Sequence, residues 1–224
     1  MTGRKAPLPL VVLVSGHGSN LQAILDRVAA GTLPVDVRAV LSDRPEAEAL
    51  NRAQAADIRT ESVTPAEFPD KAAYDEALIH AVDRHSPELV VLAGFMRILG
   101  PGFVRRHLGR MLNIHPSLLP KYRGLHTHRR ALEAGDKIHG CSVHFVTQEL
   151  DGGPVIAQAE VPVLPGDDEA ALRSRVQGRE HGLYPEVIDW YARGRLRLDG
   201  QRPVFDGVAL TMPKIFPWKA QDFP

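Results

Sequence analysis

Apolar residues along the first half of the chain form two alternating patterns, short continuous runs and stretches with helical spacing. The segment 8–14 is a near-continuous run of leucine and valine, which is typical of a strand buried on both faces of a sheet. A helix is predicted directly after it, with one apolar face made of Leu21, Ile24, Leu25 and Val28. Gly31 then ends this helix.

The same alternation continues as far as residue 115. Further strands are predicted at 35–41, 59–63, 89–93 and 111–115. Helices are predicted at 47–56 and from about residue 70, the latter with a buried stripe of Tyr74, Leu78 and Val82. Strands that alternate with helices in this order indicate a parallel sheet with helices on both faces.

The pattern changes from residue 140 onward. Strands are predicted at 141–146 and 155–163, and the turn between them is too short for a helix, so the two strands should be antiparallel. A helix follows from 167 to about 192, and the segment 200–224 is expected to be extended or partly ordered. The predicted fold is α/β, an open, mostly parallel twisted sheet with an antiparallel C-terminal portion, in one domain (1–200) with a tail (201–224).

Composition and charge narrow the functional classes. Lys plus Arg and Asp plus Glu number 27 each, and this balance argues against a nucleic-acid partner bound through a broad basic surface. The single cysteine, Cys141, excludes an intramolecular disulfide. No uncharged apolar run approaches the ~18–20 residues that span a bilayer, and the first residues lack the features of a secretory signal. We therefore expect a soluble, cytoplasmic protein with no membrane partner.

A glycine-containing loop, Ser15-Gly16-His17-Gly18-Ser19-Asn20, lies between the first predicted strand and helix. Glycines permit tight turns, and a helix N-terminus offers free N–H groups to an anion. A third glycine is missing, so the dinucleotide fingerprint of a nicotinamide-dependent oxidoreductase does not fit. The loop predicts a site for a single phosphate, and an ordinary capped loop is the alternative.

Two polar side chains stand near the end of the predicted strand 111–115. Asn113 and His115 are two positions apart and therefore share a face, and Pro116 ends the strand. Acyl transfer suits this pair, because the amide can donate to an oxyanion, worth roughly 10²- to 10³-fold in rate, and the imidazole can move a proton. A purely structural histidine is the alternative.

Asp151 lies in the glycine-containing turn 149–154, where it could serve the reaction or only cap the turn. A functional Asp151 needs a partner, and His115 is the obvious candidate. His126 and His128 lack an accompanying ligand set with familiar spacing, so no metal is expected. His80, His85 and His107 are predicted to lie on helix surfaces, and Arg129 and Arg130 at a solvated helix start.

Together these motifs resemble the phosphoribosylglycinamide formyltransferase family. The resemblance lies in four runs in the same order, Val91–Leu99, Leu112–His128, His144–Thr147 and Glu149–Pro154, and it extends over about residues 10–196. It implies a Rossmann-like formyltransferase fold with a nucleotide-binding N-terminal half and a folate-binding C-terminal half. It also implies a reaction, in which 10-formyltetrahydrofolate, as co-substrate, gives its formyl group to the amino group of glycinamide ribonucleotide. The protein would act as a monomer or homodimer.

The resemblance also assigns roles to single residues. Binding of the ribonucleotide falls to Gly18, Ser19, Asn20, Gln177 and Glu180. Binding of the folate falls to Lys71, Met96, Arg97, Ile98, Leu99, Asn113, Thr147, Gln148, Glu149, Leu150 and Asp151. In catalysis, Asn113 would polarise the formyl oxygen and His115 would stabilise the tetrahedral intermediate and act as general acid. Asp151 would favour the protonated form of His115 and help to shuttle the proton.

Three positions depart from the pattern of this family. His17 stands where asparagine is frequent, Lys71 where arginine is frequent, and Gln148 where aspartate is frequent. Lys71 keeps the charge of arginine but lacks its planar fork.

Three other functions remain open from the sequence. A formyltetrahydrofolate hydrolase would usually carry a further N-terminal domain, and a methionyl-tRNA formyltransferase a C-terminal domain with a basic surface. A non-enzymatic nucleotide-binding module would leave Asn113 and His115 unexplained.

Overall fold

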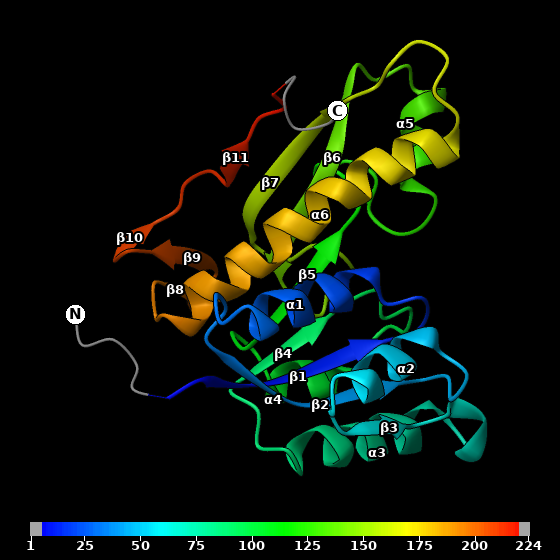
Figure 1. The fold of residues 1–224 in the computed structure, drawn as a ribbon, viewed down its shortest axis with the longest axis vertical. Helices are drawn as coiled ribbons and strands as arrows, with labels where there is room; N and C mark the ends of the chain where they lie inside the picture. The colour runs from blue at the N-terminus through cyan, green and yellow to red at the C-terminus, as the bar shows by residue number, and fades with distance from the viewer. Residues whose placement is uncertain (1–5, 220–224) are drawn as a thin grey trace.

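Eight strands form the central sheet of the protein, whose computed structural model describes residues 6–219 (Figure 1). Their order across the sheet is β11-β7-β6-β5-β4-β1-β2-β3. The strands are β1 (Leu8–Val14), β2 (Val35–Ser42), β3 (Thr60–Ser62), β4 (Leu89–Leu92), β5 (Met111–His115), β6 (Ile138–Phe145), β7 (Val155–Pro162) and β11 (Lys214–Phe216).

One strand of the eight, β6, runs opposite to all the others. Strands β3, β2, β1, β4 and β5 run parallel to their neighbours, whereas β6 is antiparallel to both β5 and β7. The predicted mostly parallel sheet with an antiparallel C-terminal portion is therefore confirmed. β6 and β7 are antiparallel because the turn that joins them is too short for the crossover that a parallel pair requires.

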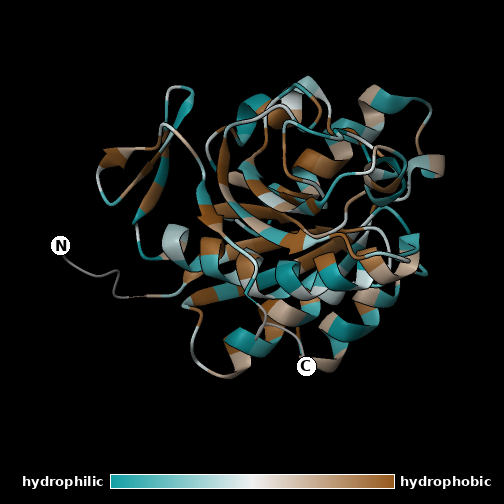
Figure 2. Ribbon diagram, turned by 90° about the horizontal axis from the view of Figure 1, so that it is seen from above, coloured by the Kyte–Doolittle hydropathy of each residue, from teal (hydrophilic) through white to brown (hydrophobic). Residues whose placement is uncertain are grey.

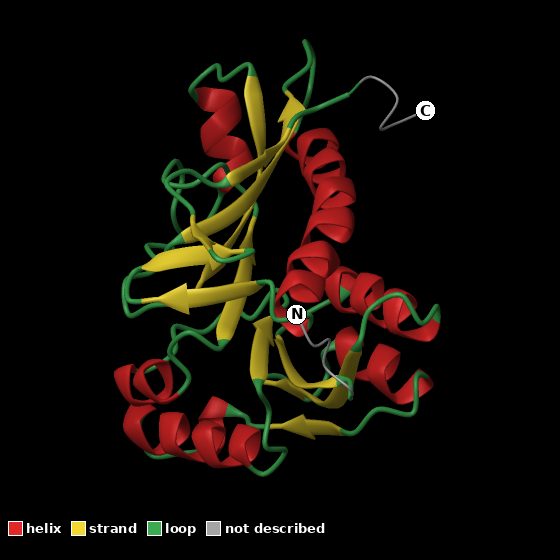
Figure 3. Cartoon of the chain, turned by 90° about the vertical axis from the view of Figure 1, so that its left-hand side faces the viewer, coloured by secondary structure: helices red, strands yellow, loops and turns green. Residues whose placement is uncertain are grey.

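Helices cover both faces of the sheet (Figure 3). They are α1 (Ser19–Ala29), α2 (Glu48–Ala55), α3 (Lys71–Asp83), α4 (Pro101–Arg106), α5 (Thr127–Glu133), α6 (Glu169–Ala192) and a 3₁₀ turn, η1 (Pro65–Glu67). Side chains of α1, α2 and α6 form one hydrophobic core with the sheet, and those of α3 and α4 form a second. In Figure 2 the interior strands are largely hydrophobic, while the helices mix hydrophobic and hydrophilic residues. Among residues 6–219, no helix has the length and apolar character needed to cross a membrane.

The C-terminal segment is more ordered than the sequence indicated. Strands β8 (Leu196–Asp199), β9 (Arg202–Phe205) and β10 (Val208–Ala209) form a separate antiparallel sheet, and β11 adds a parallel strand beside β7. The ring of Trp190 on α6 packs against Phe205 and Phe216, with centroids 4.7 and 6.2 Å apart. Two aromatic contacts to α6 thus hold the segment in place, and residues 220–224 lie outside the described part of the chain.

The prediction that His107 lies on a helix surface is wrong. His107 follows α4 and is only 1% exposed, and its ring lies 4.6 Å from that of Phe103. Burial lowers the pKa of His107 to about 4, although Asp83 opposes this shift. The six residues of α4 are too few for a clear apolar periodicity, so the sequence does not reveal this helix.

Tyr184 connects the long helix α6 to the centre of the sheet. Its side chain is fully buried, and its hydroxyl lies within hydrogen-bond distance of the carbonyl oxygens of Leu92 (3.0 Å) and Leu112 (2.9 Å). Leu92 ends β4, and Leu112 directly precedes Asn113 in β5. Because a buried hydroxyl without a partner is costly, this hydrogen bond fixes the helix against β4 and against β5, the strand that carries Asn113 and His115.

We expect the Tyr184→Phe variant to fold but to lose about 1–3 kcal/mol of unfolding free energy, since the buried hydrogen bond from this hydroxyl to the carbonyls of Leu92 and Leu112 is lost. Urea denaturation of the variant and of the parent protein measures this difference. Tyr191→Phe is the matched control, because its hydroxyl lies near the surface, 3.3 Å from the carbonyl of Gly109. An equal loss in both variants would contradict a special role for Tyr184.

Replacement of His107 tests how much stability the protein loses at low pH because this buried imidazole stays unprotonated. Between about pH 6.5 and the folded-state pKa of about 4, the unfolded chain binds a proton at this position and the folded chain does not. The stability of the folded chain is therefore unaffected by proton binding at His107 above the pKa of the unfolded chain, and it decreases as the pH falls below that value. When the pH is lowered from neutral to about 5, the unfolding free energy of the parent protein should fall by about 1–2 kcal/mol more than that of the His107→Leu variant. Urea denaturation at both pH values measures this difference, and His80→Gln, at an exposed histidine, is the control. If His107→Leu had the same pH dependence as the parent protein, the role of His107 would be contradicted.

Candidate functional site

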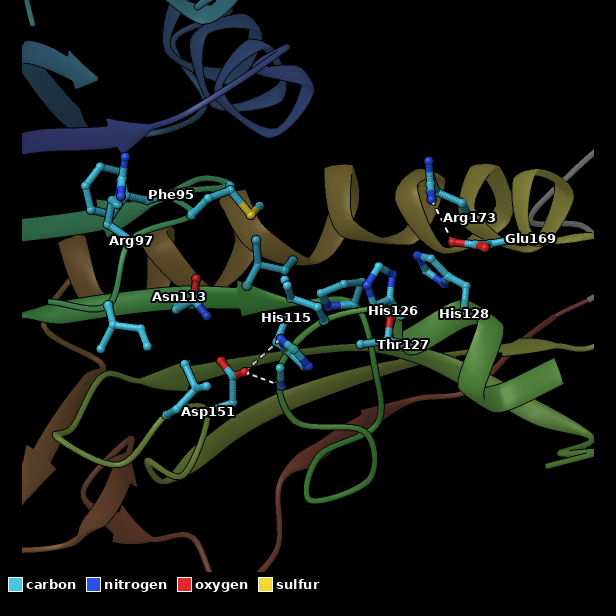
Figure 4. A pocket seen from close by; sticks show the side chains of 18 residues that line it. Phe95, Arg97, Asn113, His115, His126, Thr127, His128, Asp151, Glu169 and Arg173 are labelled. Carbon is cyan, nitrogen blue, oxygen red and sulfur yellow. Dashed lines mark hydrogen bonds and ion pairs between the residues drawn. The ribbon is translucent and has the colours of Figure 1, made fainter. Parts of the chain in front are cut away.

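Asn113 and His115, the polar pair on β5, lie in the wall of a cavity. The cavity has a volume of 680 Å³, which lies in the range of small-molecule sites, and Asn113 and His115 line it together (Figure 4). It lies beyond the carboxyl ends of β4 and β5, where open α/β sheets bind ligands. The segment Gly94–Ile98 after β4 lines the same cavity, so two neighbouring strand ends form this part of its wall.

His115 is buried, 6% exposed, and both of its ring nitrogens face oxygen atoms. Its Nδ1 lies 3.4 Å from Asp151 Oδ2, and its Nε2 lies 2.9 Å from the carbonyl oxygen of Tyr122. An imidazolium can donate a proton to each of these oxygens, whereas a neutral ring can donate only one. The ring of His115 is therefore held from both nitrogens, by the loop that carries Asp151 and by the segment that follows β5.

Asp151 reaches His115 from the loop that joins β6 and β7. Its backbone has a φ of 47°, a left-handed conformation that aspartate tolerates better than most residues. Gly153 fixes the loop, because an added Cβ there would lie 1.8 Å from the carbonyl oxygen of Phe145. The backbone N–H of Gly124 donates to Asp151 Oδ2 over 2.9 Å. A loop held by close backbone packing thus aims this carboxylate at the end of β5.

His144 completes this cluster; it lies in one of the runs that resemble the family, but the sequence analysis assigned it no role. It lies opposite Asn113 in the antiparallel register of β5 and β6, with Asn113 Nδ2 3.0 Å from His144 Nε2. Burial lowers the pKa of His144 to about 4, so the ring is neutral at pH 7. Because its Nδ1 donates to the carbonyl of Phe145, its Nε2 accepts a hydrogen bond from the Asn113 amide. The amide is thereby oriented, and its second N–H is left for a ligand.

The segments predicted to bind folate lie on both sides of a smaller cavity of 90 Å³. This cavity is lined by Arg97, Ile98 and Leu99 from one segment and by residues 147–151 from the other. Arg97 donates to the fully buried carboxylate of Asp43 over 2.9 Å, which anchors the first segment. Met96 is 61% exposed and Ile98 62%, so both present apolar surface to a ligand.

Lys71 lines a neighbouring cavity of 530 Å³ together with Met96, Arg97 and Ile98. Its ammonium group donates to Asp75 over 2.6 Å. The lysine thus lies beside the segment 96–98 and apart from the polar pair on β5.

The residues predicted to bind the ribonucleotide come together between α1 and α6. Gln177 donates to the hydroxyl of Ser19 over 2.7 Å, and Asn20 donates to Glu180 over 2.8 Å. Burial raises the pKa of Glu180, and the bond from Asn20 opposes this rise. Gly18 precedes α1 with a φ of 80°. The N-terminus of α1 thus presents its free N–H groups next to polar side chains of α6.

His126 and His128 both line the 680 Å³ cavity, and His128 also packs against a second histidine. His128 Nδ1 lies 3.1 Å from His139 Nε2, and burial lowers the pKa of each ring to about 4. Arg129 and Arg130 lie within α5 and are exposed, and Arg129 donates to Glu169. Among residues 6–219, no group of three or more histidine, cysteine, aspartate or glutamate side chains is arranged to hold a metal ion.

A family model and similar known proteins agree with one another. The family model described as formyl transferase matches residues 8–188. Phosphoribosylglycinamide formyltransferase of Escherichia coli strain K12 is 57% identical over 200 residues, which cover 86% of this chain and 94% of that protein. The enzyme of the same name from Haemophilus influenzae is 43% identical over 201 residues, covering 90% of this chain and 95% of that protein.

A solved structure supports the same relationship. Phosphoribosylglycinamide formyltransferase from Coxiella burnetii superimposes with a TM-score of 0.91 at 50% sequence identity, covering 94% of this chain and 100% of that chain. The matched residues 8–188 include β1, the loop 15–20 that was predicted to bind an anion (the anion loop), β5 and most of α6. The chain therefore belongs to the formyl transferase family and, within it, to the phosphoribosylglycinamide formyltransferases.

Proposed function

We propose that this protein transfers the formyl group of 10-formyltetrahydrofolate to the amino group of glycinamide ribonucleotide. The products are formylglycinamide ribonucleotide and tetrahydrofolate, a step of purine biosynthesis. One observation carries the proposal: Asn113, His115 and Asp151 meet at the end of β5, in a cavity of suitable size for these reactants. The names of the relatives support the same reaction.

The ribonucleotide fits the side of the site formed by α1 and α6. The N–H groups at Gly18, Ser19 and Asn20 suit a phosphate, because the positive end of the helix dipole lies there. Gln177 and Glu180 are within reach of a sugar and its glycinamide substituent, since they already contact Ser19 and Asn20. A buried carboxylate that accepts hydrogen bonds is a suitable partner for sugar hydroxyls.

The folate fits the side formed by residues 96–99 and 147–151. The Thr147 hydroxyl is buried and makes no hydrogen bond within the described residues, as expected of a group that awaits a polar ligand. Met96, Ile98 and Leu150 offer exposed apolar surface for a flat ring. Lys71, with Gln148 and Glu149, would contact the outer parts of the molecule.

Asn113 acts on the oxygen of the formyl group. When the amino nitrogen attacks, negative charge develops on this oxygen, and the free N–H of Asn113 donates to it. The bond from Asn113 to His144 holds the amide in place before the reaction, so little reorganisation is needed. Comparable donors contribute roughly 10²- to 10³-fold in rate.

His115 and Asp151 handle the protons. A bond forms between the amino nitrogen and the formyl carbon, and the bond from that carbon to N10 of the folate breaks. One proton leaves the amino nitrogen and one reaches N10. His115 lies at the cavity wall and can carry this proton, while Asp151 stabilises its charged form and orients the ring.

We assign the activity to one domain over residues 1–200 in a cytoplasmic protein. The residues assigned to the site extend from Gly18 to Glu180 and converge at one end of a single sheet. The buried free thiol of Cys141 suits a reducing compartment.

The direct experiment mixes the protein with 10-formyltetrahydrofolate and follows tetrahydrofolate with and without glycinamide ribonucleotide. We expect release that depends on the ribonucleotide and yields one formylated ribonucleotide per folate. Release at the same rate without the ribonucleotide would indicate hydrolysis, and no release in either case would indicate a binding module.

We expect His115→Ala and Asp151→Asn to lower kcat by about 10²-fold or more, because each removes part of the proton path. Circular dichroism should show that both variants stay folded. The matched control is Asp168→Asn, since Asp168 caps α6 by accepting from the N–H of Ala171 and lies outside the cavity. Near-normal turnover in either site variant would rule out the assigned role.

A further inference from the structure

Helix α2 makes a contact with each of three successive residues of the anion loop. The N–H of Ala49 donates to the carbonyl of Gly16 over 3.0 Å, and Arg52 Nε donates to the carbonyl of His17 over 2.8 Å. Gly18 packs against Ala49 so closely that an added Cβ would lie 2.6 Å from the Ala49 Cβ. The loop is therefore held against α2 along its whole glycine-containing part.

Arg52 has the most extensive set of these contacts. Besides the His17 carbonyl, its guanidinium donates to Glu48 over 2.7 Å and lies 3.4 Å from Gln22 Oε1 and 3.0 Å from His17 Nε2. The side chain is 23% exposed, so most of the fork lies against protein. One guanidinium thus joins the loop, the first turn of α1 and the first turn of α2.

This arrangement bears on the proposed phosphate site, which begins at the next residue. The N–H groups of Gly18, Ser19 and Asn20 must converge on one phosphate, and small displacements of such donors are costly. Glu48 pairs with Arg52 and offsets part of its charge, and His17 is the other titratable side chain that faces it. The role of Arg52 is therefore mainly geometric, and a planar fork with several fixed donors suits that role better than a lysine would.

We propose that Arg52 is a positioning residue of the phosphate-binding loop and that it sets the affinity for the phosphate of the ribonucleotide. It does so by holding the His17 carbonyl and thereby the direction of the three following N–H groups. This inference rests on the function proposed above, because it assumes that a phosphate occupies the loop.

The test compares two acceptors, glycinamide ribonucleotide and the same molecule without its phosphate. For Arg52→Ala we expect the KM for the ribonucleotide to rise about tenfold, which corresponds to the loss of about 1.4 kcal/mol of binding. The kcat and the KM for 10-formyltetrahydrofolate should change less than about twofold, and kcat/KM for the dephosphorylated acceptor should be unchanged. Arg52→Lys should show a smaller rise in KM, because it keeps the charge but loses the fork.

Arg44→Gln is the matched control, since Arg44 is an exposed arginine in the connection between β2 and α2, and it should leave all constants unchanged. An unchanged KM for the ribonucleotide in Arg52→Ala would overturn the inference. Equal losses with both acceptors would also overturn it, because they would show a general structural role.

The two proposals fail in distinguishable ways. If the parent protein does not formylate the ribonucleotide, the proposed function fails. If the parent is active and Arg52 variants keep its preference for the phosphorylated acceptor, only the inference about Arg52 fails. Should Arg52→Ala not fold, the comparison of Arg52→Lys with the parent protein decides the matter on the same two acceptors.

Discussion

The site depends on one carboxylate, that of Asp151, reaching the end of β5. Its Oδ2 lies 3.4 Å from His115 and accepts from the N–H of Gly124, and its Oδ1 lies 3.7 Å from His144. The group is almost fully buried, and a buried charge persists only when hydrogen bonds and opposite charge compensate for lost hydration. The loop, the end of the strand and the segment that follows it are therefore held in one arrangement around this side chain.

The reversed direction of one strand, β6, makes this arrangement possible. Because β6 runs antiparallel to β5, His144 lies directly opposite Asn113, and the chain then turns back through the loop that carries Asp151. The parallel part of the sheet positions two further segments, because β1 leads into the anion loop and β4 leads into residues 94–98. Parallel pairing thus places the loop 15–20 and the segment 94–98 after neighbouring strands, and antiparallel pairing places His144 and Asp151 beside the end of β5.

Much of this could be predicted from the sequence. The strands β1 and β5 lie where the apolar pattern placed them, and the two-residue spacing of Asn113 and His115 puts both in the wall of the cavity. Asp151 is tied to His115 in the sequence only by resemblance to a family, because nothing local states where a distant loop will lie. The short elements α4 and β8–β11 have too few residues for a periodic signal, and the burial of His107 is hidden for that reason.

His144 and Arg52 escape sequence analysis for a different physical reason. The position of His144 opposite Asn113 depends on the register of two strands, and the contacts of Arg52 depend on how α2 packs against the loop. Both are tertiary properties, whereas an apolar pattern reports only local spacing.

A double-mutant cycle on kcat/KM tests most directly whether Asp151 acts through His115. The cycle compares the parent protein, each single variant, His115→Ala and Asp151→Asn, and the variant that carries both changes. If the two side chains work as one unit, the double variant will lose about as much activity as the more damaging single variant. If the two losses instead multiply, the side chains act independently, which would contradict a proton path that Asp151 serves through His115.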